Sequence, residues 1–221
     1  MKTCFHRLLP LLLSSTLSVA VQAQFTFTTN GGAITITRYI GTDRSVTIPS
    51  EIDGYPVTSI GPYAFASIYS VPVIIPTITS VTIPDSVTSI GMDAFGGCTN
   101  LQIVMLGNHV ANIGGDAFAS CSSLTNINLP ASVINLGSYV FAGCYNLTAI
   151  TVDANNPVYS SVNGVLFDKS RATLIEYPGG LSGNYTIPGT VTNIADGAFA
   201  GCIGVTGVTI PDTVTYIGPA E

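Results

Sequence analysis

The sequence predicts a β-rich α/β solenoid, in which short coils of one chain stack so that their strands form a parallel sheet. The first observation is a unit of 23 residues that occurs twice in succession, beginning at Ile78 and again at Leu101. The second is that matching positions of the two units carry matching chemistry, as in the pair Phe95 and Phe118. Because a unit this short cannot bury its own apolar face, neighbouring units must stack on one another.

Residues 1–23 are predicted to be an export signal and not part of the fold. Lys2 and Arg7 precede an apolar run over residues 8–21, and residues 21–23 form a small-x-small cleavage site. The apolar run is shorter than the roughly 20 residues of a membrane-spanning helix, and no later stretch approaches that length. We therefore expect a secreted or cell-surface protein without a transmembrane segment in its mature chain.

The charge balance excludes nucleic acid as a partner. Without the export signal the chain keeps four basic residues against twelve acidic ones, a net charge of −8. Nucleic-acid binding needs a basic face that displaces counterions from the phosphates, and this composition does not supply one.

Residues 24–45 predict an N-terminal β-hairpin cap. Apolar and polar residues alternate from Phe25 and again from Ala33, on either side of a turn that begins at Asn30-Gly31. The end of a solenoid exposes unpaired strand edge and core, so a hairpin at this position would cover both.

Residues 46–221 are predicted to form the solenoid, with seven strands spaced 23 or 35 residues apart. In each strand, apolar residues two apart should point inward, such as Val81 and Ile83, while Thr82 between them points outward. The second inward residues of the seven strands are Ile48, Ile83, Leu106, Leu129, Val152, Ile187 and Ile210.

After each strand, the pattern V-x-x-I-G-x-x-A-F-x-x-C is expected to build the remaining walls of the coil. Gly91 and its equivalents should mark a sharp bend before a short helical turn that carries Ala-Phe, which is the α component of the predicted fold. The phenylalanines at this offset should stack as an aromatic spine inside the core. They are Phe65, Phe95, Phe118, Phe141 and Phe199.

Two coils are enlarged, over about residues 48–83 and 152–187. The first is lengthened partly by a return segment, residues 68–78. In the second, the segments VLF and TLIEY flank a charged turn and predict a hairpin. Lys169 and Arg171 at its tip are half of the mature basic residues, so we take them as candidate insertion contacts. The alternative is a hairpin that packs on the flank of the solenoid without a ligand.

The chain stops at Glu221, where the next Ala-Phe turn is expected, and this predicts an incomplete C-terminal end. A coil left open presents unpaired strand edges, and such edges favour end-to-end self-association.

The repeats resemble a known family. The units IGMDAFGGCTNLQ and IGSYVFAGCYNLTAITV, with IPSEIDGYPVTSIGPYAF near the start, are similar to the BspA-like (Treponema pallidum type) leucine-rich repeats, over roughly Val46 to Gly218. The resemblance implies a right-handed, gently curved leucine-rich repeat solenoid with a parallel sheet on one face. It also implies secreted or surface proteins that engage other proteins or neighbouring surfaces, and it brings no catalytic residues with it.

Four cysteines share one repeat offset, which Ile68 occupies in the first coil. This makes the position apolar and inward, so we expect stacked, buried free thiols. A bridge between adjacent coils stays open as an alternative, because the spacing of parallel strands falls within the permitted Cα separation. A straight row of thiols cannot surround zinc tetrahedrally. The four are Cys98, Cys121, Cys144 and Cys202.

No constellation for catalysis is apparent. His109 is the only histidine after the export signal, and no carboxylate stands at a fixed neighbouring repeat position to orient it. The aspartates mostly occupy repeat turns, where they cap bends. We therefore expect no enzymatic activity, no cofactor and no metal site.

The leading functional hypothesis is a non-catalytic binding or adhesion module for a protein or glycan. Outward residues of the strands would form its face, with Ile103 and Met105 as an apolar centre where a hot spot is expected. One alternative is a structural spacer or stalk of a larger surface protein with recognition elsewhere. Another is ice binding by outward threonines, a row that Met105 and Asn128 interrupt. The candidate face comprises Ser80, Thr82, Ile103, Met105, Asn126, Asn128, Thr151 and Thr209.

Overall fold

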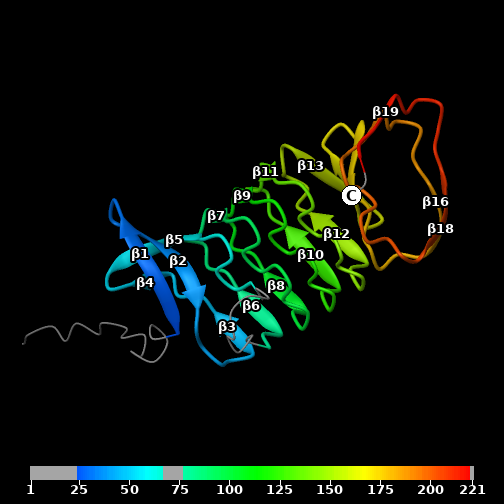
Figure 1. Ribbon diagram of the computed structural model, residues 1–221. Coiled ribbons are helices and arrows are strands. Elements are labelled where there is room, and N and C mark those ends of the chain that lie inside the picture. Colours follow the sequence, from blue (N-terminus) through cyan, green and yellow to red (C-terminus); the bar gives the residue numbers. More distant parts are fainter. Residues whose placement is uncertain (1–23, 67–76, 220–221) are drawn as a thin grey trace, which may run out of the picture.

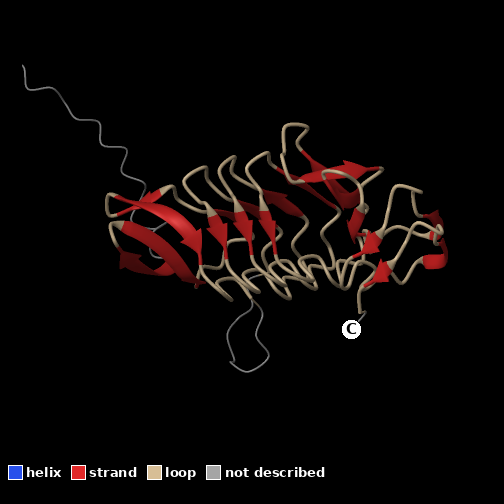
Figure 2. Cartoon of the chain, turned by 90° about the horizontal axis from the view of Figure 1, so that it is seen from above, coloured by secondary structure: helices blue, strands red, loops and turns tan. Residues whose placement is uncertain are grey.

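The computed structural model describes residues 24–66 and 77–219, which form an elongated stack of coils (Figures 1 and 2). The β1–β2 hairpin lies at one end of the stack, and β16, β18 and β19 lie at the other. The predicted export signal, residues 1–23, and most of the predicted return segment 68–78 lie outside the described residues.

One side of the stack carries strands at the seven predicted positions within the described residues. β3, β6 and β8 form a parallel sheet, β10 and β12 form a parallel pair that lies against β8, and β16 pairs in parallel with β18. These strands are β3 (Ser45–Thr47), β6 (Ser80–Thr82), β8 (Ile103–Met105), β10 (Asn126–Leu129), β12 (Ala149–Val152), β16 (Gly183–Thr186) and β18 (Val205–Thr209).

A second side carries the shorter strands that follow in each coil. One sheet runs in the order β1-β2-β5-β7-β9-β11, with β4 paired to β5, and a separate sheet runs β13-β14-β15-β17-β19. The strands of the first sheet are β1 (Phe25–Asn30), β2 (Ala33–Tyr39), β4 (Glu51–Ile52), β5 (Tyr55–Ile60), β7 (Ser89–Ile90), β9 (Asn112–Ile113) and β11 (Asn135–Leu136). Those of the second are β13 (Tyr159–Val162), β14 (Val165–Asp168), β15 (Thr173–Glu176), β17 (Asn193–Ile194) and β19 (Tyr216–Ile217).

The α/β part of the predicted fold class is wrong, because no helix occurs among residues 24–66 and 77–219. The Gly-x-x-Ala-Phe segment closes as separate turns, in which the Ala94 N–H donates to the Gly91 carbonyl at 3.3 Å. A helix cannot run through this segment, since Asp93 adopts a left-handed φ of 51°. The equivalent residues of other coils also have positive φ. They are Tyr63, Asp116, Tyr139 and Gly197.

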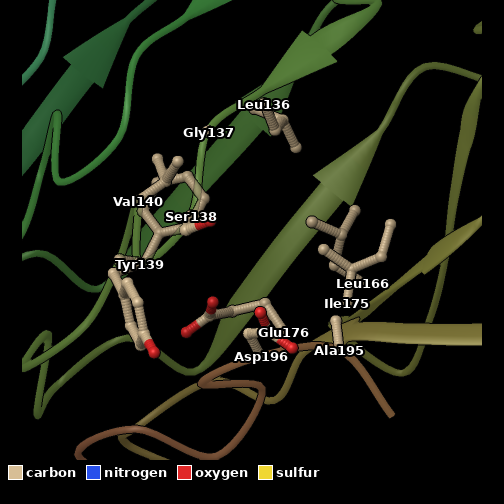
Figure 3. Close-up of a pocket in the computed structure, with 11 residues that line it drawn as sticks. Leu136, Gly137, Ser138, Tyr139, Val140, Leu166, Ile175, Glu176, Ala195 and Asp196 are labelled. Carbon is tan, nitrogen blue, oxygen red and sulfur yellow. The ribbon is translucent and has the colours of Figure 1, made fainter. Parts of the chain in front are cut away.

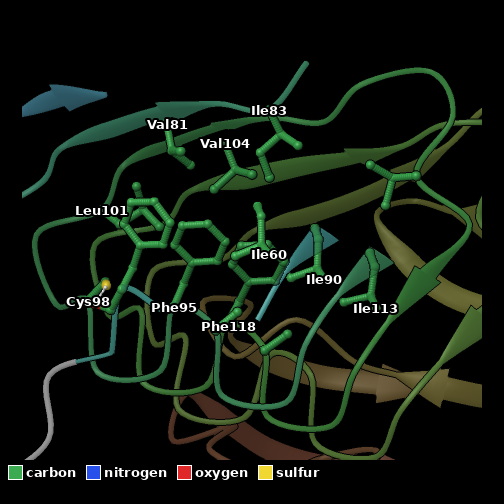
Figure 4. Packing of buried hydrophobic residues seen from close by; sticks show 14 of the residues in the cluster. Ile60, Val81, Ile83, Ile90, Phe95, Cys98, Leu101, Val104, Ile113 and Phe118 are labelled. Atoms are coloured by element: carbon green, nitrogen blue, oxygen red, sulfur yellow. Dashed lines mark hydrogen bonds between the residues drawn. The ribbon is translucent and has the colours of Figure 1, made fainter. Parts of the chain in front are cut away.

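The core between the two sides follows the predicted alternation in the inner coils, whereas Ile210, predicted to point inward in the last strand, is 47% exposed. Val81 and Ile83 are almost completely buried and face the aromatic rings across the coil (Figure 4). Phe95 and Phe118 stack with ring centroids 5.2 Å apart and an interplanar angle of 4°. Such offset pairs add a modest attraction, of about 1 kcal/mol, to the area that the rings bury.

The predicted spine extends further at one end and is interrupted at the other. Phe65 stacks on Phe95 at 4.7 Å and Phe118 on Phe141 at 5.9 Å, and Tyr39 continues the file by stacking on Phe65 at 5.3 Å. The fifth predicted member, Phe199, stacks instead on Tyr177 at 5.2 Å, in a second file.

The repeated glycine stands where successive coils approach backbone to backbone. A Cβ added at Gly114 would lie 2.6 Å from the Met92 nitrogen and 2.8 Å from the Gly91 carbonyl carbon. Real Cβ atoms do not come so close to backbone atoms, so the position accepts only glycine without a shift of the coil.

Both predicted hairpins are antiparallel pairs. β1 pairs with β2 around Gly31 and Gly32, which have φ of 58° and 81°. β2 then pairs in parallel with β5, so this hairpin continues directly into the second side of the stack. Its role as an end cap stays a prediction. β14 pairs with β15, as the VLF and TLIEY segments predict.

Two further hairpins were not predicted. β4 and β5 pair around Asp53 and Gly54, and β13 and β14 pair around Asn163 and Gly164. All four turn residues have positive φ, between 51° and 82°, as type I′ turns require. Asp-Gly and Asn-Gly are the dipeptides that favour this turn, so the sequence did contain the pattern.

The second enlarged coil has a shortened bend. Leu174 in β15 pairs with Ile194 in β17. The Tyr177 N–H donates to the Ala198 carbonyl at 2.7 Å, which sets Tyr177 opposite Phe199. Phe199 follows Ile194 by five residues, whereas Tyr177 follows Leu174 by three. The bend of this coil therefore lacks two residues that its neighbours have.

Candidate functional site

The strands bring most of the predicted face together in two parallel rows. β6 and β8 place Ser80 beside Ile103 and Thr82 beside Met105. Ile103 and Met105 are each 54% exposed, although residues of this type are usually buried. The predicted apolar centre is therefore on the surface.

The rows continue with polar residues on β10 and β12. Asn126 pairs with Ala149, and Asn128 pairs with Thr151. The Thr151 hydroxyl donates to the Asn128 side-chain oxygen at 3.0 Å, so this part of the face is held by hydrogen bonds between coils.

A shallow depression of about 490 Å³ lies beside the apolar pair. Ile103 and Asn126 of the predicted face line it, and the other lining residues are polar and come from the adjoining loops. They are Gln102, Ser123, Thr125 and Asn146.

Thr209 is separated from this group. It is exposed on β18, and its paired residue is Thr186 on β16, in a sheet that does not include β12. We therefore use the name candidate face for the seven residues that β6, β8, β10 and β12 bring together. They are Ser80, Thr82, Ile103, Met105, Asn126, Asn128 and Thr151.

The two predicted insertion contacts have different surroundings. The Lys169 ammonium donates to the carbonyls of Ala154 at 3.2 Å and Asn156 at 2.6 Å, so it is held against a turn of its own coil. Arg171 is exposed with a φ of 60°. Asp168 fixes this turn, because its carboxylate accepts the Thr173 N–H at 2.7 Å.

The four cysteines are free thiols. Each thiol donates a hydrogen bond to a backbone carbonyl of the preceding coil. The Cys98 thiol donates to the Phe65 carbonyl at 3.2 Å and the Cys121 thiol to the Phe95 carbonyl at 3.3 Å. Burial raises the pKa of Cys98 to about 12 and that of Cys121 well above its usual range. Such thiols are poor nucleophiles at neutral pH, because the thiolate is the reactive form.

His109 lies on an exposed loop, where its Nδ1 is 3.0 Å from the Asp85 carbonyl oxygen. In the described part of the chain, no three His, Cys, Asp or Glu side chains gather as a metal site. Nor does any helix there have the length and apolar character to cross a membrane.

The sequence reasoning missed Glu176, the one buried acid in the described residues (Figure 3). Glu176 is only 6% exposed, and it lines a cavity of about 290 Å³ at the shortened bend. The alternation in TLIEY could have revealed it, because Glu176 lies two residues after Leu174 and so shares its inward face.

Comparison with known proteins identifies the repeat. The family described as BspA type leucine-rich repeat region matches residues 58–183 and 181–220, in six copies. The chain belongs to the BspA-type leucine-rich repeat family. This confirms the resemblance seen in the repeat units. No curated protein matches this BspA-type protein.

Solved structures with the same fold include the pneumococcal vaccine antigen PcpA, at 23% identity and a TM-score of 0.63 over 77% of this chain. The chain spans about half the length of that structure, 51%. A leucine-rich repeat protein of T. pallidum is 26% identical, with a TM-score of 0.55 over 88% of this chain and 84% of its own. One from Eubacterium ventriosum is also 26% identical, with a TM-score of 0.59 over 86% of this chain and 58% of its own.

Proposed function

We propose that this BspA-type protein is an exported, non-catalytic module that binds a protein or glycan partner through the candidate face. The observation that carries the proposal is the exposed pair Ile103 and Met105, which lies in the middle of a polar sheet and beside a depression. An apolar centre with a polar surround is the arrangement of binding hot spots.

The chemistry around the pair favours an uncharged or weakly charged contact surface. The candidate face contains hydroxyl, amide and apolar side chains and no charged residue. Hydrogen bonds to serine, threonine and asparagine would supply specificity, while burial of Ile103 and Met105 would supply affinity. The short strands are hydrogen-bonded to their neighbours, so little conformational entropy is lost on binding.

The test uses purified chain against a panel of extracellular matrix proteins and a glycan array, with affinity measured by biolayer interferometry. Ile103→Asp and Met105→Asp should each weaken binding by at least about tenfold, because each places a charge in the apolar centre. Ile134→Asp and Met92→Asp are matched controls, since these residues are 45% and 47% exposed elsewhere on the molecule.

Binding that survives both face variants would show that the site lies elsewhere. Failure to bind any member of the panel would favour the second reading, in which the solenoid is a spacer within a larger surface protein.

A further inference from the structure

The cavity beside Glu176 follows from the shortened bend. In the preceding coil the bend runs through Ser138 and Tyr139, and in the following coil through Asp196. The coil between them has only Ile175 and Glu176 between its strand residue Leu174 and its aromatic residue Tyr177. The bends of the preceding and following coils therefore have no turn of this coil packed between them. The space that this leaves is the cavity of about 290 Å³, hereafter the Glu176 cavity.

One wall is built by the Tyr139 side chain. A Cβ at Gly197 would overlap the Tyr139 ring, so the ring reaches across the gap to the following coil. Asp196 is exposed at the surface, and its carboxylate accepts a hydrogen bond from the Tyr216 hydroxyl at 3.3 Å. The cavity thus has one open side with an acid at its edge and a second acid, Glu176, further in.

The lining is divided by polarity (Figure 3). The Glu176 carboxyl, the Asp196 carboxyl and the Tyr139 hydroxyl lie at one end, while Leu136, Leu166 and Ile175 lie at the other. None of the residues that line the cavity is Lys, Arg or His. A ligand would therefore meet two acids without a compensating cation from the protein.

Glu176 is a buried acid that has no basic residue to pair with in the cavity lining. The residue is only 6% exposed, and no lysine, arginine or histidine lines the cavity beside its carboxyl. Burial raises the pKa of this carboxyl well above its ordinary value, and no basic residue of the cavity lining opposes the shift. A buried carboxyl is normally paired or hydrogen-bonded, so a complementary ligand would remove a free-energy cost of the fold.

We propose that the Glu176 cavity is a binding site for a small amphiphilic amine, whose ammonium pairs with Glu176 and whose apolar body packs against Leu136, Leu166 and Ile175. The ammonium supplies the missing cation, and its three N–H groups suit two carboxylates and a hydroxyl. The volume holds about ten water-sized groups at ~30 Å³ each, which limits the ligand to a short alkylamine or a single-ring arylalkylamine.

The experiment measures binding of benzylamine and n-hexylamine to the purified chain by isothermal titration calorimetry at neutral pH. Benzyl alcohol, which has nearly the same shape and no charge, is the ligand control. We expect both amines to bind with millimolar or tighter dissociation constants, and benzyl alcohol to bind at least about tenfold more weakly.

Glu176→Gln should weaken amine binding by at least about 30-fold, because glutamine cannot release a proton and become the charge partner of the ammonium. Glu51→Gln changes an exposed glutamate in another coil and should leave binding unchanged. Ala195→Leu fills the cavity while Glu176 remains, and it should also abolish binding. Thermal unfolding followed by circular dichroism checks that each variant is folded.

The proposal is overturned if no amine binds, if benzyl alcohol binds as tightly as benzylamine, or if Glu176→Gln binds the amines unchanged. It can be separated from the proposed function, because Ile103→Asp and Met105→Asp alter none of the residues that line the cavity. Those variants should therefore retain amine binding even where they lose the macromolecular partner.

Discussion

Asn156 shows how a single side chain anchors the enlarged second coil. It is fully buried, and its amide nitrogen donates to the carbonyls of Pro130 at 3.0 Å and Val133 at 2.8 Å. Its side-chain oxygen accepts the N–H groups of Val158 at 2.9 Å and Tyr159 at 2.7 Å. The side chain therefore satisfies four backbone groups, two of which belong to the preceding coil.

Asn156→Ala should lower the free energy of unfolding by about 3 kcal/mol, because it leaves these buried backbone groups without partners. Asn155→Ala is the control, since Asn155 is exposed and its side chain makes no such bonds in the described residues; it should change stability by less than about 0.5 kcal/mol. Urea denaturation followed by circular dichroism measures both. Equal losses for the two variants would contradict this account.

Glu176 makes stability depend on pH. Its pKa in the folded protein is raised by burial, so between the ordinary carboxyl pKa and the raised value the folded state holds a proton that the unfolded state has released. Stability must then fall as pH rises through this window, by about 1.4 kcal/mol per pH unit, and level off above the raised pKa. The other titratable groups that face Glu176 are Tyr139, Asp196, Cys144 and Cys202.

Glu176→Gln should therefore be more stable than the wild type at neutral pH and nearly equal to it near the ordinary carboxyl pKa, about 4.3. Urea midpoints across this pH range test the expectation. Glu51→Gln, at an exposed position, should follow the wild-type profile. A Glu176→Gln profile parallel to that of the wild type would show that the carboxyl does not hold its proton in the fold.

For single residues, the sequence predicted which side chains point inward more readily than it predicted what surrounds them. The inward thiols could be expected because an apolar residue occupies their offset in another coil, and the structure buries Cys98, Cys121 and Cys144 but leaves Cys202 half-buried. The inward position of Glu176 could be expected from the alternation in TLIEY, but the cavity beside it could not. The cavity depends on the two residues that this bend lacks, and the difference is visible only once Leu174 and Ile194 are seen to pair.

Among the elements, the glycine bend controls how closely the coils stack. Gly114→Ala should destabilise the protein by about 2 kcal/mol or more, because the added Cβ meets backbone atoms of the preceding coil that cannot move separately. Gly189→Ala is a matched control, since no atom lies within 4 Å of a Cβ at that position. The control should be neutral or slightly stabilising, because alanine restricts the unfolded chain.

Thermal unfolding of the two variants separates a packing effect from a general cost of losing glycine. If Gly189→Ala lowered the melting temperature as much as Gly114→Ala, close approach of the coils would not be the reason for glycine in the repeat.

The prediction of a helical turn failed because it rested on helix propensity and did not take account of the backbone φ at one position of the segment. The Ala-Phe segment lies between apolar and polar residues that suit a helix, but the residue two places before the phenylalanine, such as Asp93, is left-handed in five coils. Aspartate and asparagine tolerate this conformation, whereas Tyr63 and Tyr139 adopt it with nothing in their type to indicate it. Stacking of the coils therefore overrides local preference.

For the whole molecule, spacing alone predicted the order of the coils but not the continuity of the sheets. The 35-residue interval from Val152 to Ile187 was predicted as an enlarged coil, and it does contain a hairpin. The structure adds that this coil contributes a three-stranded antiparallel segment, β13-β14-β15, and divides the aromatic residues into two files. Pairing between strands distant in sequence decides this, and a single sequence does not reveal it.

The last described coil combines strand edges with exposed apolar side chains. β18 and β19 each lie at the edge of their sheets. Val208, Ile210 and Ile217 on and beside these strands are 38%, 47% and 57% exposed. Unpaired strand edges with apolar side chains favour pairing with another chain, and lysine on such edges prevents it.

A chain of this sequence should therefore self-associate as its concentration rises, with Val208 and Ile217 in the contact. The double variant Val208→Lys with Ile217→Lys should lower the association constant by at least about tenfold, because two charges would be buried at the contact. Ile134→Lys, which changes an exposed isoleucine in another coil, should associate like the wild type. Sedimentation equilibrium measures all three. A monomer at every concentration, or equal association by the double variant, would show that the exposed edge is not self-complementary.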